Sequence, residues 1–177
     1  MMYTCYYDSP LGRILLAADE TGLTGAWFEG QKYFADGLSE GRAAGESSAL
    51  AAAIRWLDVY FSGREPDFLP PLHPKGSEFR RAVWDILLTI PYGQTMTYGG
   101  IARELAVAAG LPRMSAQAVG GAVGHNPISV IIPCHRVVGT GGSLTGYAGG
   151  IGKKIALLKS EHTDMTGLFV PQKGTAL

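Results

Sequence analysis

Cysteine is scarce in this sequence of 177 residues, and its scarcity excludes two kinds of protein. The two cysteines, Cys5 and Cys134, lie far apart in the chain. They cannot form a disulfide framework, and they cannot supply the cysteine pairs on which many zinc sites are built. We therefore expect no disulfide framework. We also expect that the protein holds no metal and no cofactor.

Long apolar runs are also missing. A helix that crosses a bilayer needs about 20 consecutive apolar residues, and no stretch of the chain approaches this length. The start, MMYTCYYDSP, lacks the basic segment followed by an apolar one that marks a signal peptide. With 46% apolar and 17% charged residues, the composition is that of a globular protein. We expect a soluble, cytoplasmic protein that binds no membrane.

The chain has no net charge, but its two halves differ. Residues 1–74 contain five basic and ten acidic residues, whereas residues 75–177 contain ten basic and five acidic ones. Overall neutrality argues against a protein that coats nucleic acid through many phosphate contacts. If a polyanion binds, it binds the second half. The alternative is an ordinary fluctuation of surface charge.

The first half predicts a small sheet followed by a helix. Short runs of β-branched, aromatic and aliphatic residues at 3–7, 13–19 and 23–29 are separated by turn sequences and predict strands. Residues 49–63 have helical periodicity and end in a glycine. The segment 64–76 carries four of the ten prolines and predicts a linker where the charge changes sign.

The second half predicts helices. Ser77, Thr97 and Ser115 are candidate N-caps for helices over 79–90, 97–109 and 116–124, and a last helix is predicted over 153–161. The second and third of these helices have the outline of a helix-turn-helix, although a plain helical hairpin has the same spacing. Residues 126–139 are apolar and predicted to be extended. We expect domains over 1–74 and 75–162 and a tail over 163–177.

Cys134 is the candidate nucleophile. A buried cysteine is usually inert, but a neighbouring base or positive charge lowers the pKa of a thiol from about 8.5 and activates it. His135 and Arg136 follow directly in the sequence. Adjacent residues of a strand point to opposite faces, so a turn or a bridging water would have to connect Cys134 with His135. Glu161 is the nearest acidic residue after the next loop and could orient the imidazole, or could simply be a solvated helix end.

Two neighbouring segments complete the candidate site. Asn126, the only asparagine in the chain, could brace the turn before the cysteine segment or form a common Asx-Pro turn. The loop 139–150 has six glycines in a spacing that fits neither a dinucleotide fingerprint nor a phosphate loop. It predicts a lid, or a backbone that packs closely against a flat ligand. The small residues of 116–124 would permit close approach to another helix or to the minor groove of DNA.

The stretch AVGGAVGHNPISVIIPCHRVVGTGGSLTGYAGG, residues 118–150, resembles the O6-alkylguanine-DNA alkyltransferases, also called methylated-DNA–protein-cysteine methyltransferases. Its Pro-Cys-His-Arg core is highly specific, and the resemblance extends through 79–102 and, more weakly, through 6–33. It implies an α+β fold: an N-terminal α/β domain with an antiparallel, ribonuclease H-like sheet, then a mostly helical, winged helix-turn-helix-like domain.

The resemblance also implies a DNA repair reaction that needs no cofactor. O6-alkylguanine, with O4-alkylthymine as a second candidate lesion, would be flipped out of double-stranded DNA. Cys134 would attack the alkyl carbon, and His135, oriented by Glu161, would take the thiol proton through a water. The thioether would not be cleaved, so a monomer would be consumed in one turnover. Further roles would fall to Asn126, which braces the turn, to Tyr98, which binds the leaving guanine, to Tyr147, Ala148 and Gly149, which line the pocket, and to Arg80 and Thr140, which bind DNA.

One position departs from the family, and three other functions compete with alkyl transfer. The family commonly has an arginine that fills the space left by the flipped base, where this chain has Gln117. Relatives with tryptophan at the cysteine position are not enzymes, whereas this chain has Cys134. The alternatives are a Cys-His hydrolase, a helix-turn-helix transcription factor and a protein that binds lesions without reacting. The helix 116–124 offers almost no base-reading side chains, which disfavours the transcription factor.

Overall fold

The computed structural model describes residues 1–172, which divide into two compact units. The first unit comprises Met1–Lys75 together with Pro127–Ile131. The second comprises Gly76–Asn126 and the chain from Ile132 onward. The second unit differs from the expected domain 75–162, because Lys75 and residues 127–131 group with the first unit.

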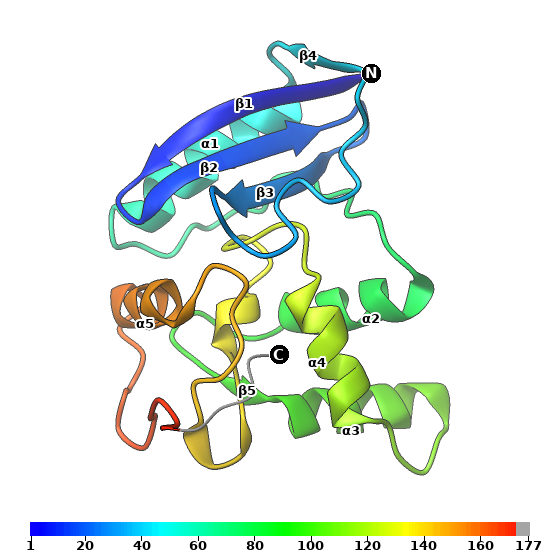
Figure 1. The fold of residues 1–177 in the computed structure, drawn as a ribbon, viewed down its shortest axis with the longest axis vertical. Coiled ribbons are helices and arrows are strands. Elements are labelled where there is room, and N and C mark those ends of the chain that lie inside the picture. The colour runs from blue at the N-terminus through cyan, green and yellow to red at the C-terminus, as the bar shows by residue number, and fades with distance from the viewer. Residues whose placement is uncertain (173–177) are drawn as a thin grey trace. The chain divides into compact units, whose positions relative to one another are not determined.

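The first unit contains a four-stranded sheet. Its strands are β1 (Met2–Ser9), β2 (Gly12–Ala18), β3 (Leu23–Phe28) and β4 (Arg42–Ala44), in the order β3-β2-β1-β4. The first three pair antiparallel, as expected, but β4 joins the edge of β1 in parallel (Figure 1). Sequence analysis missed β4 because three residues in a polar, glycine-containing stretch carry no period-two pattern.

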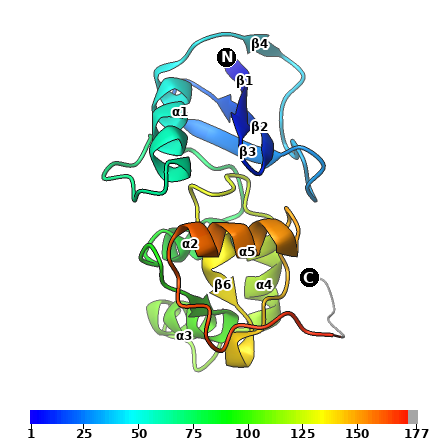
Figure 2. The same cartoon turned by 90° about the vertical axis from the view of Figure 1, so that its left-hand side faces the viewer.

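Helix α1 (Ser48–Phe61) covers one face of this sheet (Figures 1 and 2). It begins at Ser47, whose hydroxyl accepts the amide hydrogen of Leu50 at 3.1 Å and replaces an intrahelical bond that the first turn lacks. Residues of the opposite face form a separate apolar cluster of Leu15, Ala17 and Trp27, with Ala35 and Leu38 of the following loop packed against it. Because both faces are covered, β2 and β3 are apolar almost without alternation.

Residues 127–131 belong to the first unit because they pair with the edge of β3. The amide of Ala26 donates to the carbonyl of Pro127 at 2.8 Å, and the amide of Ser129 donates to the carbonyl of Ala26 at 2.8 Å. Ile128 forms a single parallel bridge with Ala26, and residues 129–131 form a turn in which Val130 has a φ of +71°. The predicted extended conformation is therefore wrong for most of this segment.

The second unit is mostly helical. Its helices are α2 (Glu78–Leu87), α3 (Tyr98–Ala109), α4 (Ala116–Gly124) and α5 (Ile151–Ser160), with short 3-10 turns η1 (Cys134–Arg136) and η2 (Thr140–Gly142). Two-residue strands β5 (Met96–Thr97) and β6 (Val137–Val138) pair in parallel. The predicted N-caps Ser77, Thr97 and Ser115 each accept an amide hydrogen from the first turn of their helix.

Helix α5 lies on one side of the short β5–β6 pair, and α2 and α4 lie on the other (Figures 1 and 2). The small residues Gly120 and Ala122 on the buried face of α4 let its neighbours approach closely. The indole of Trp84 on α2 donates to the carbonyl of Ala122 at 2.9 Å. Close helix packing therefore explains these small residues, whereas Gly121 on the opposite face of α4 is exposed.

Part of the predicted tail packs against the second unit. Met165 and Leu168 contact a buried cluster of Val138, Leu144 and Leu158, and the amide of Leu144 donates to the carbonyl of Phe169 at 2.8 Å. Residues 173–177 of that predicted tail lie outside the described part of the chain. Within residues 1–172, no helix is long and apolar enough to cross a membrane.

Candidate active site

Cys134 begins the turn η1 and is 5% exposed. Its amide donates to the carbonyl of Ile132 at 2.8 Å, and its own carbonyl accepts the amide of Val137, which closes the turn. The segment predicted as extended is thus a 3-10 turn at the cysteine. Successive side chains of such a turn are not held on opposite faces, so the geometric objection to a Cys134–His135 pair does not apply here.

Burial raises the pKa of the Cys134 thiol above its ordinary value. A hydrogen bond from the side chain of Asn126 and the positive charge of Lys154 act in the opposite direction without cancelling the effect of burial. The resting group is therefore the thiol, and attack on an electrophile requires a base that removes its proton.

Three side chains form a buried charged cluster beside the cysteine. Nε2 of His135 lies 2.6 Å from Oε1 of Glu161, the residue that caps the end of α5. Arg136 donates from Nε to Oε2 of Glu161 at 2.9 Å and from Nη2 to Oε1 at 3.0 Å. Its Nη1 donates to the carbonyl of Ile90 at 2.6 Å. Glu161 is thus held from both sides, and it is not the solvated helix end that one alternative predicted.

The ionisation states of this cluster follow from its contacts. Burial alone would raise the pKa of Glu161, but the hydrogen bonds and charges of His135 and Arg136 hold it at about 2. Burial lowers the pKa of His135, against the opposing influence of Glu161. A neutral imidazole beside an ionised carboxylate, which can only accept, carries its proton on Nε2. Nδ1 then holds the lone pair and is the basic atom of the ring.

Asn126 closes the loop that leads to the cysteine. Its Nδ2 donates to the carbonyl of Ile132 at 2.8 Å, six residues further along the chain. This bond joins the two ends of the segment 127–131, which is held at the edge of β3. This contact is compatible with the bracing role expected for Asn126, which stays a prediction.

Tyr98, the first residue of α3, is buried. Its hydroxyl donates to the carbonyl of Thr145 in the glycine-rich loop at 3.3 Å. Burial, together with the charge of Cys134, raises the pKa of Tyr98 to about 12. The phenol therefore remains a hydrogen-bond donor throughout the physiological pH range.

The remaining predicted site residues are more exposed to solvent. Tyr147, Ala148 and Gly149 are half-buried in the loop before α5. Gln117 on α4 and Thr140 on η2 are exposed, and Arg80 on α2 is half-buried. The structure therefore gathers Cys134, His135, Glu161, Asn126 and Tyr98 into one buried site and leaves the predicted DNA-binding residues on separate elements around it.

One glycine of the glycine-rich loop, Gly142, lies close to the backbone of another segment of the chain. Gly142 has a φ of +94°, and a Cβ there would lie 2.2 Å from the carbonyl oxygen of Gly167. The amide of Phe169 donates to the carbonyl of Gly142 at 3.1 Å. At this position the loop backbone lies against the chain's own segment 165–169. The predicted packing of the loop against a flat ligand stays a prediction.

Sequence reasoning missed two residues of the site. The sequence suggests Arg136 as a positive charge for the thiol, whereas its guanidinium binds Glu161. Lys154 is absent from the predicted site, although it is fully buried and its charge acts on Cys134. The available signal was its position on the apolar face of 151–160, three residues before Leu157 and four before Leu158. A charged residue at such a position needs a reason to be buried.

Two family models match the chain. Residues 2–74 match "6-O-methylguanine DNA methyltransferase, ribonuclease-like domain", and residues 78–163 match "6-O-methylguanine DNA methyltransferase, DNA binding domain". The fold and the family models thus define a protein with a ribonuclease-like unit and a helical DNA-binding unit. The second unit contains a buried thiol, Cys134, followed in the sequence by a histidine that binds a buried glutamate. The α+β class predicted from the sequence is confirmed.

Individual relatives are similar in sequence to nearly the whole chain. The methylated-DNA–protein-cysteine methyltransferase of Methanosarcina acetivorans is 40% identical over 174 residues, 90% of this chain and 98% of that protein. The protein of the same name from Mycobacterium leprae is 41% identical over 172 residues, 95% and 98% of the two chains. A crystal structure of Mycobacterium tuberculosis OGT in complex with DNA is 40% identical, covers 90% of this chain and 91% of its own, and has a TM-score of 0.76. The chain belongs to the 6-O-methylguanine DNA methyltransferase family, which confirms the resemblance seen in the sequence.

Proposed function

We propose that the protein repairs DNA by transferring an alkyl group from O6 of guanine to Sγ of Cys134. The observation that carries this proposal is the buried thiol beside the His135–Glu161 pair, inside the unit that matches the family's DNA-binding domain. The sulfur forms a bond to the alkyl carbon while the bond from that carbon to O6 breaks. The electron pair of the broken bond stays on guanine, which then takes a proton.

His135 is the proposed base. A water molecule passes the thiol proton to Nδ1 of the neutral imidazole, and Glu161 stabilises the imidazolium through Nε2. Tyr98 is the proposed donor to the leaving guanine, since its phenol keeps its proton and lies near Cys134. Asn126 supports the thiolate by its hydrogen bond to the sulfur.

Duplex DNA is the proposed partner, and the lesion must leave the base stack. The thiol is nearly inaccessible, so the O6-alkyl group of a stacked guanine cannot reach it. The exposed Gln117 is the candidate to fill the vacated space, and Tyr147, Ala148 and Gly149 are the candidates to line the pocket. Arg80 and Thr140 are proposed to contact the DNA. O4-alkylthymine is the second candidate lesion.

The product is a thioether, from which no group at this site can expel the sulfur. The protein therefore acts once. We also propose that it acts as a monomer and that it is located in the cytoplasm. A Cys-His hydrolase built on the same pair would instead turn over repeatedly on an ester.

The test is to incubate the full chain with a duplex that contains O6-methylguanine and to digest it with trypsin. We expect one methyl group per protein on the peptide Met114–Arg136, whose only cysteine is Cys134. Cys134→Ala should bind the damaged duplex without accepting the methyl group, whereas Cys5→Ala should behave as the parent. Methylation of Cys5, or many turnovers per protein on DNA or on an ester, would contradict the proposal.

A further inference from the structure

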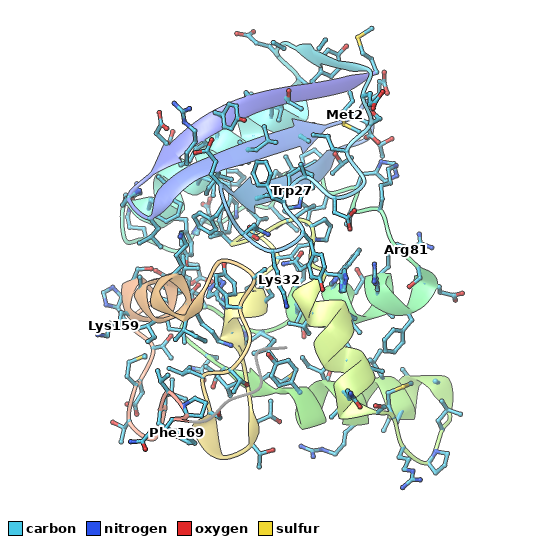
Figure 3. The ribbon with its side chains drawn as sticks, in the orientation of Figure 1. Met2, Trp27, Lys32, Arg81, Lys159 and Phe169 are labelled. Atoms are coloured by element: carbon cyan, nitrogen blue, oxygen red, sulfur yellow. The ribbon has the colours of Figure 1, made fainter. Side chains whose placement is uncertain are left out.

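The segment 165–170, which we call the strap, forms a short backbone ladder with the glycine-rich loop 139–150. The amide of Leu144 donates to the carbonyl of Phe169 at 2.8 Å, and the amide of Phe169 donates to the carbonyl of Gly142 at 3.1 Å. These bonds form a parallel bridge at Phe169, which lies beside the loop (Figure 3). The segment that follows α5 is thus bonded to the loop that precedes α5.

The contact between the strap and the loop requires a glycine in the loop. Gly142 has a φ of +94°, and a Cβ there would lie 2.2 Å from the carbonyl oxygen of Gly167. Because a backbone carbonyl cannot rotate away as a side chain can, any larger residue at this position would displace the strap. Gly141 also has a positive φ, +73°, but a Cβ there would meet nothing within 4 Å. Gly141 therefore serves only its own backbone conformation, whereas Gly142 also serves the contact with the strap.

The strap also makes apolar contacts. Its residues Met165 and Leu168 are half-buried against three buried residues from three elements: Val138 of β6, Leu144 of the loop and Leu158 of α5. The removal of this apolar surface from water stabilises the contact. Phe169 and Val170 are 50% and 52% exposed. The strap therefore lies at the surface and can be displaced without opening the core of the unit.

The strap compensates for the cost of ordering the loop. Six residues of the loop are glycines, and glycine loses more conformational freedom on being fixed than any other residue. Thr145 directly follows the strap-bonded Leu144, and its carbonyl accepts the hydroxyl of Tyr98 at 3.3 Å. Tyr147 follows two residues later. The strap thus fixes the loop immediately before the residues that are proposed to line the base pocket.

We propose that the strap is a positioning element for alkyl transfer: it holds residues 142–144 so that residues 145–149 keep the conformation that binds the alkylated guanine. The inference rests on the proposed function in taking residues 145–149 as a wall of the base pocket. The order of the loop can be measured without any substrate, so the two proposals can fail separately.

The main test compares Gly142→Ala with Gly141→Ala in the full chain. Both variants place an alanine at a positive φ and share that backbone strain, but only Gly142→Ala directs a Cβ into the strap. The order of the loop is measured by hydrogen exchange with mass spectrometry. We expect the amides of residues 144–149 to exchange about tenfold faster in Gly142→Ala. In the control they should exchange as in the parent.

The second measurement is the rate of alkylation by free O6-benzylguanine as a function of its concentration, which leaves contacts with DNA aside. If the loop is competent to bind in only about one molecule in ten, the apparent affinity falls about tenfold. The concentration that gives half the limiting rate should therefore rise about tenfold in Gly142→Ala. The limiting rate should stay at the parental value, because Cys134, His135 and Glu161 are unaltered. A general loosening of the unit would instead lower the limiting rate.

Two results would overturn the inference. The first is parental exchange of residues 144–149 in a folded Gly142→Ala, and the second is faster exchange with an unchanged half-saturating concentration. If the parent accepts no alkyl group from O6-benzylguanine or from a duplex with O6-methylguanine, the proposed function fails. The exchange difference then decides by itself whether the strap orders the loop.

Leu168→Ala covers the case in which Gly142→Ala does not fold. It removes an apolar contact of the strap and leaves the sequence of the loop intact. The control is Val170→Ala, because Val170 is exposed and lies one residue beyond the bridge. We expect residues 144–149 to exchange faster in Leu168→Ala than in the control. Equal exchange in these two variants would refute the role of the strap.

Discussion

At the scale of single residues, Glu161 is an ionised, buried carboxylate that several donors hold in place. It accepts hydrogen bonds from His135, Arg136 and the amide of Gly93, the last at 3.3 Å. These partners hold its pKa at about 2, against an ordinary value of 4.5. A carboxyl group whose pKa is lower in the folded protein stabilises the fold at pH values above its unfolded pKa. That stabilisation is lost as the pH falls from about 4.5 through 2.

Glu161→Gln tests this electrostatic contribution. The amide leaves Arg136 buried without a negative partner, so we expect a loss of about 3–5 kcal/mol in the free energy of unfolding at pH 7. Urea denaturation at several pH values should also show that the variant loses less stability than the parent between pH 4.5 and 2. Equal slopes of stability against pH in that window would mean that another carboxyl group is responsible.

His135 should determine the acid limit of the reaction. Because burial lowers its pKa below 6.5, the imidazole stays neutral and basic at pH values where an exposed histidine is already protonated. The rate of methyl transfer should therefore decline only below pH 6.5. His135→Ala should slow the transfer by roughly 10²–10⁴-fold, the usual contribution of a positioned base. Single-turnover rates measure both effects.

The matched control for this change is His162→Ala, since His162 is exposed. It should react at the parental rate. Parental kinetics in His135→Ala would show that the thiol proton leaves by another route.

At the scale of elements, α4 has a buried face and an exposed face. Its inner face, with Val119 and Ala122, packs against α2 and α3. Its outer face carries Gln117 near a helix start capped by Ser115. A neutral amide can fill a gap in a base stack by shape and hydrogen bonding, but it brings no charge to the phosphates. Duplex affinity should accordingly be modest.

Gln117→Ala should slow methyl transfer from duplex DNA and leave the reaction with free O6-benzylguanine unchanged. The reason is that the side chain of Gln117 is proposed to stabilise only the duplex from which the damaged base has been flipped out. Alanine is chosen because it preserves the helix. Gln117→Arg should tighten duplex binding and steepen the slope of log affinity against log salt by about 0.9. Unchanged rates on both substrates in Gln117→Ala would exclude residue 117 as the gap-filling side chain.

At the scale of the whole molecule, the chain leaves the second unit after Asn126 and returns to it at Ile132. Segment 127–131 leaves α4, pairs with β3 and continues into the cysteine turn. Gln31 secures it: its buried Oε1 accepts the amide of Phe28 at 2.8 Å and the hydroxyl of Ser129 at 3.1 Å. These backbone and side-chain hydrogen bonds hold segment 127–131 within the first unit.

Gln31→Ala should destabilise the first unit by about 1–3 kcal/mol, since it removes the acceptor of two buried donors. Urea denaturation followed by intrinsic fluorescence would measure this, because Trp27 lies in the same sheet. Gln94→Ala, at an exposed position of the second unit, is the control and should change stability by less than about 0.5 kcal/mol. An equal response of the two variants would show that Gln31 does not support the segment.

Local patterns determined the elements of this protein. Alternating and continuous apolar runs specified β1 to β3, and hydroxyl caps specified where α2, α3 and α4 begin, because both signals depend on residues near in sequence. The Pro-Cys-His-Arg core identified the family, which the family models confirm. Its prediction of Cys134 as the nucleophile and His135 as the base stays a prediction. The limits expected for the domains and the DNA-contact roles of Arg80, Thr140 and Gln117 stay predictions.

The partners of the buried charges were decided only by the tertiary structure. Arg136 binds Glu161 rather than the thiol, and Lys154 meets carbonyls 17 and 9 residues earlier in the chain. Residues 127–131 follow the edge of β3 instead of continuing as a strand toward Cys134. Such pairings depend on which groups the fold brings within hydrogen-bond distance after water is excluded. Sequence spacing carries no information about that distance, and burial makes each of these contacts strong enough to set the ionisation of the site.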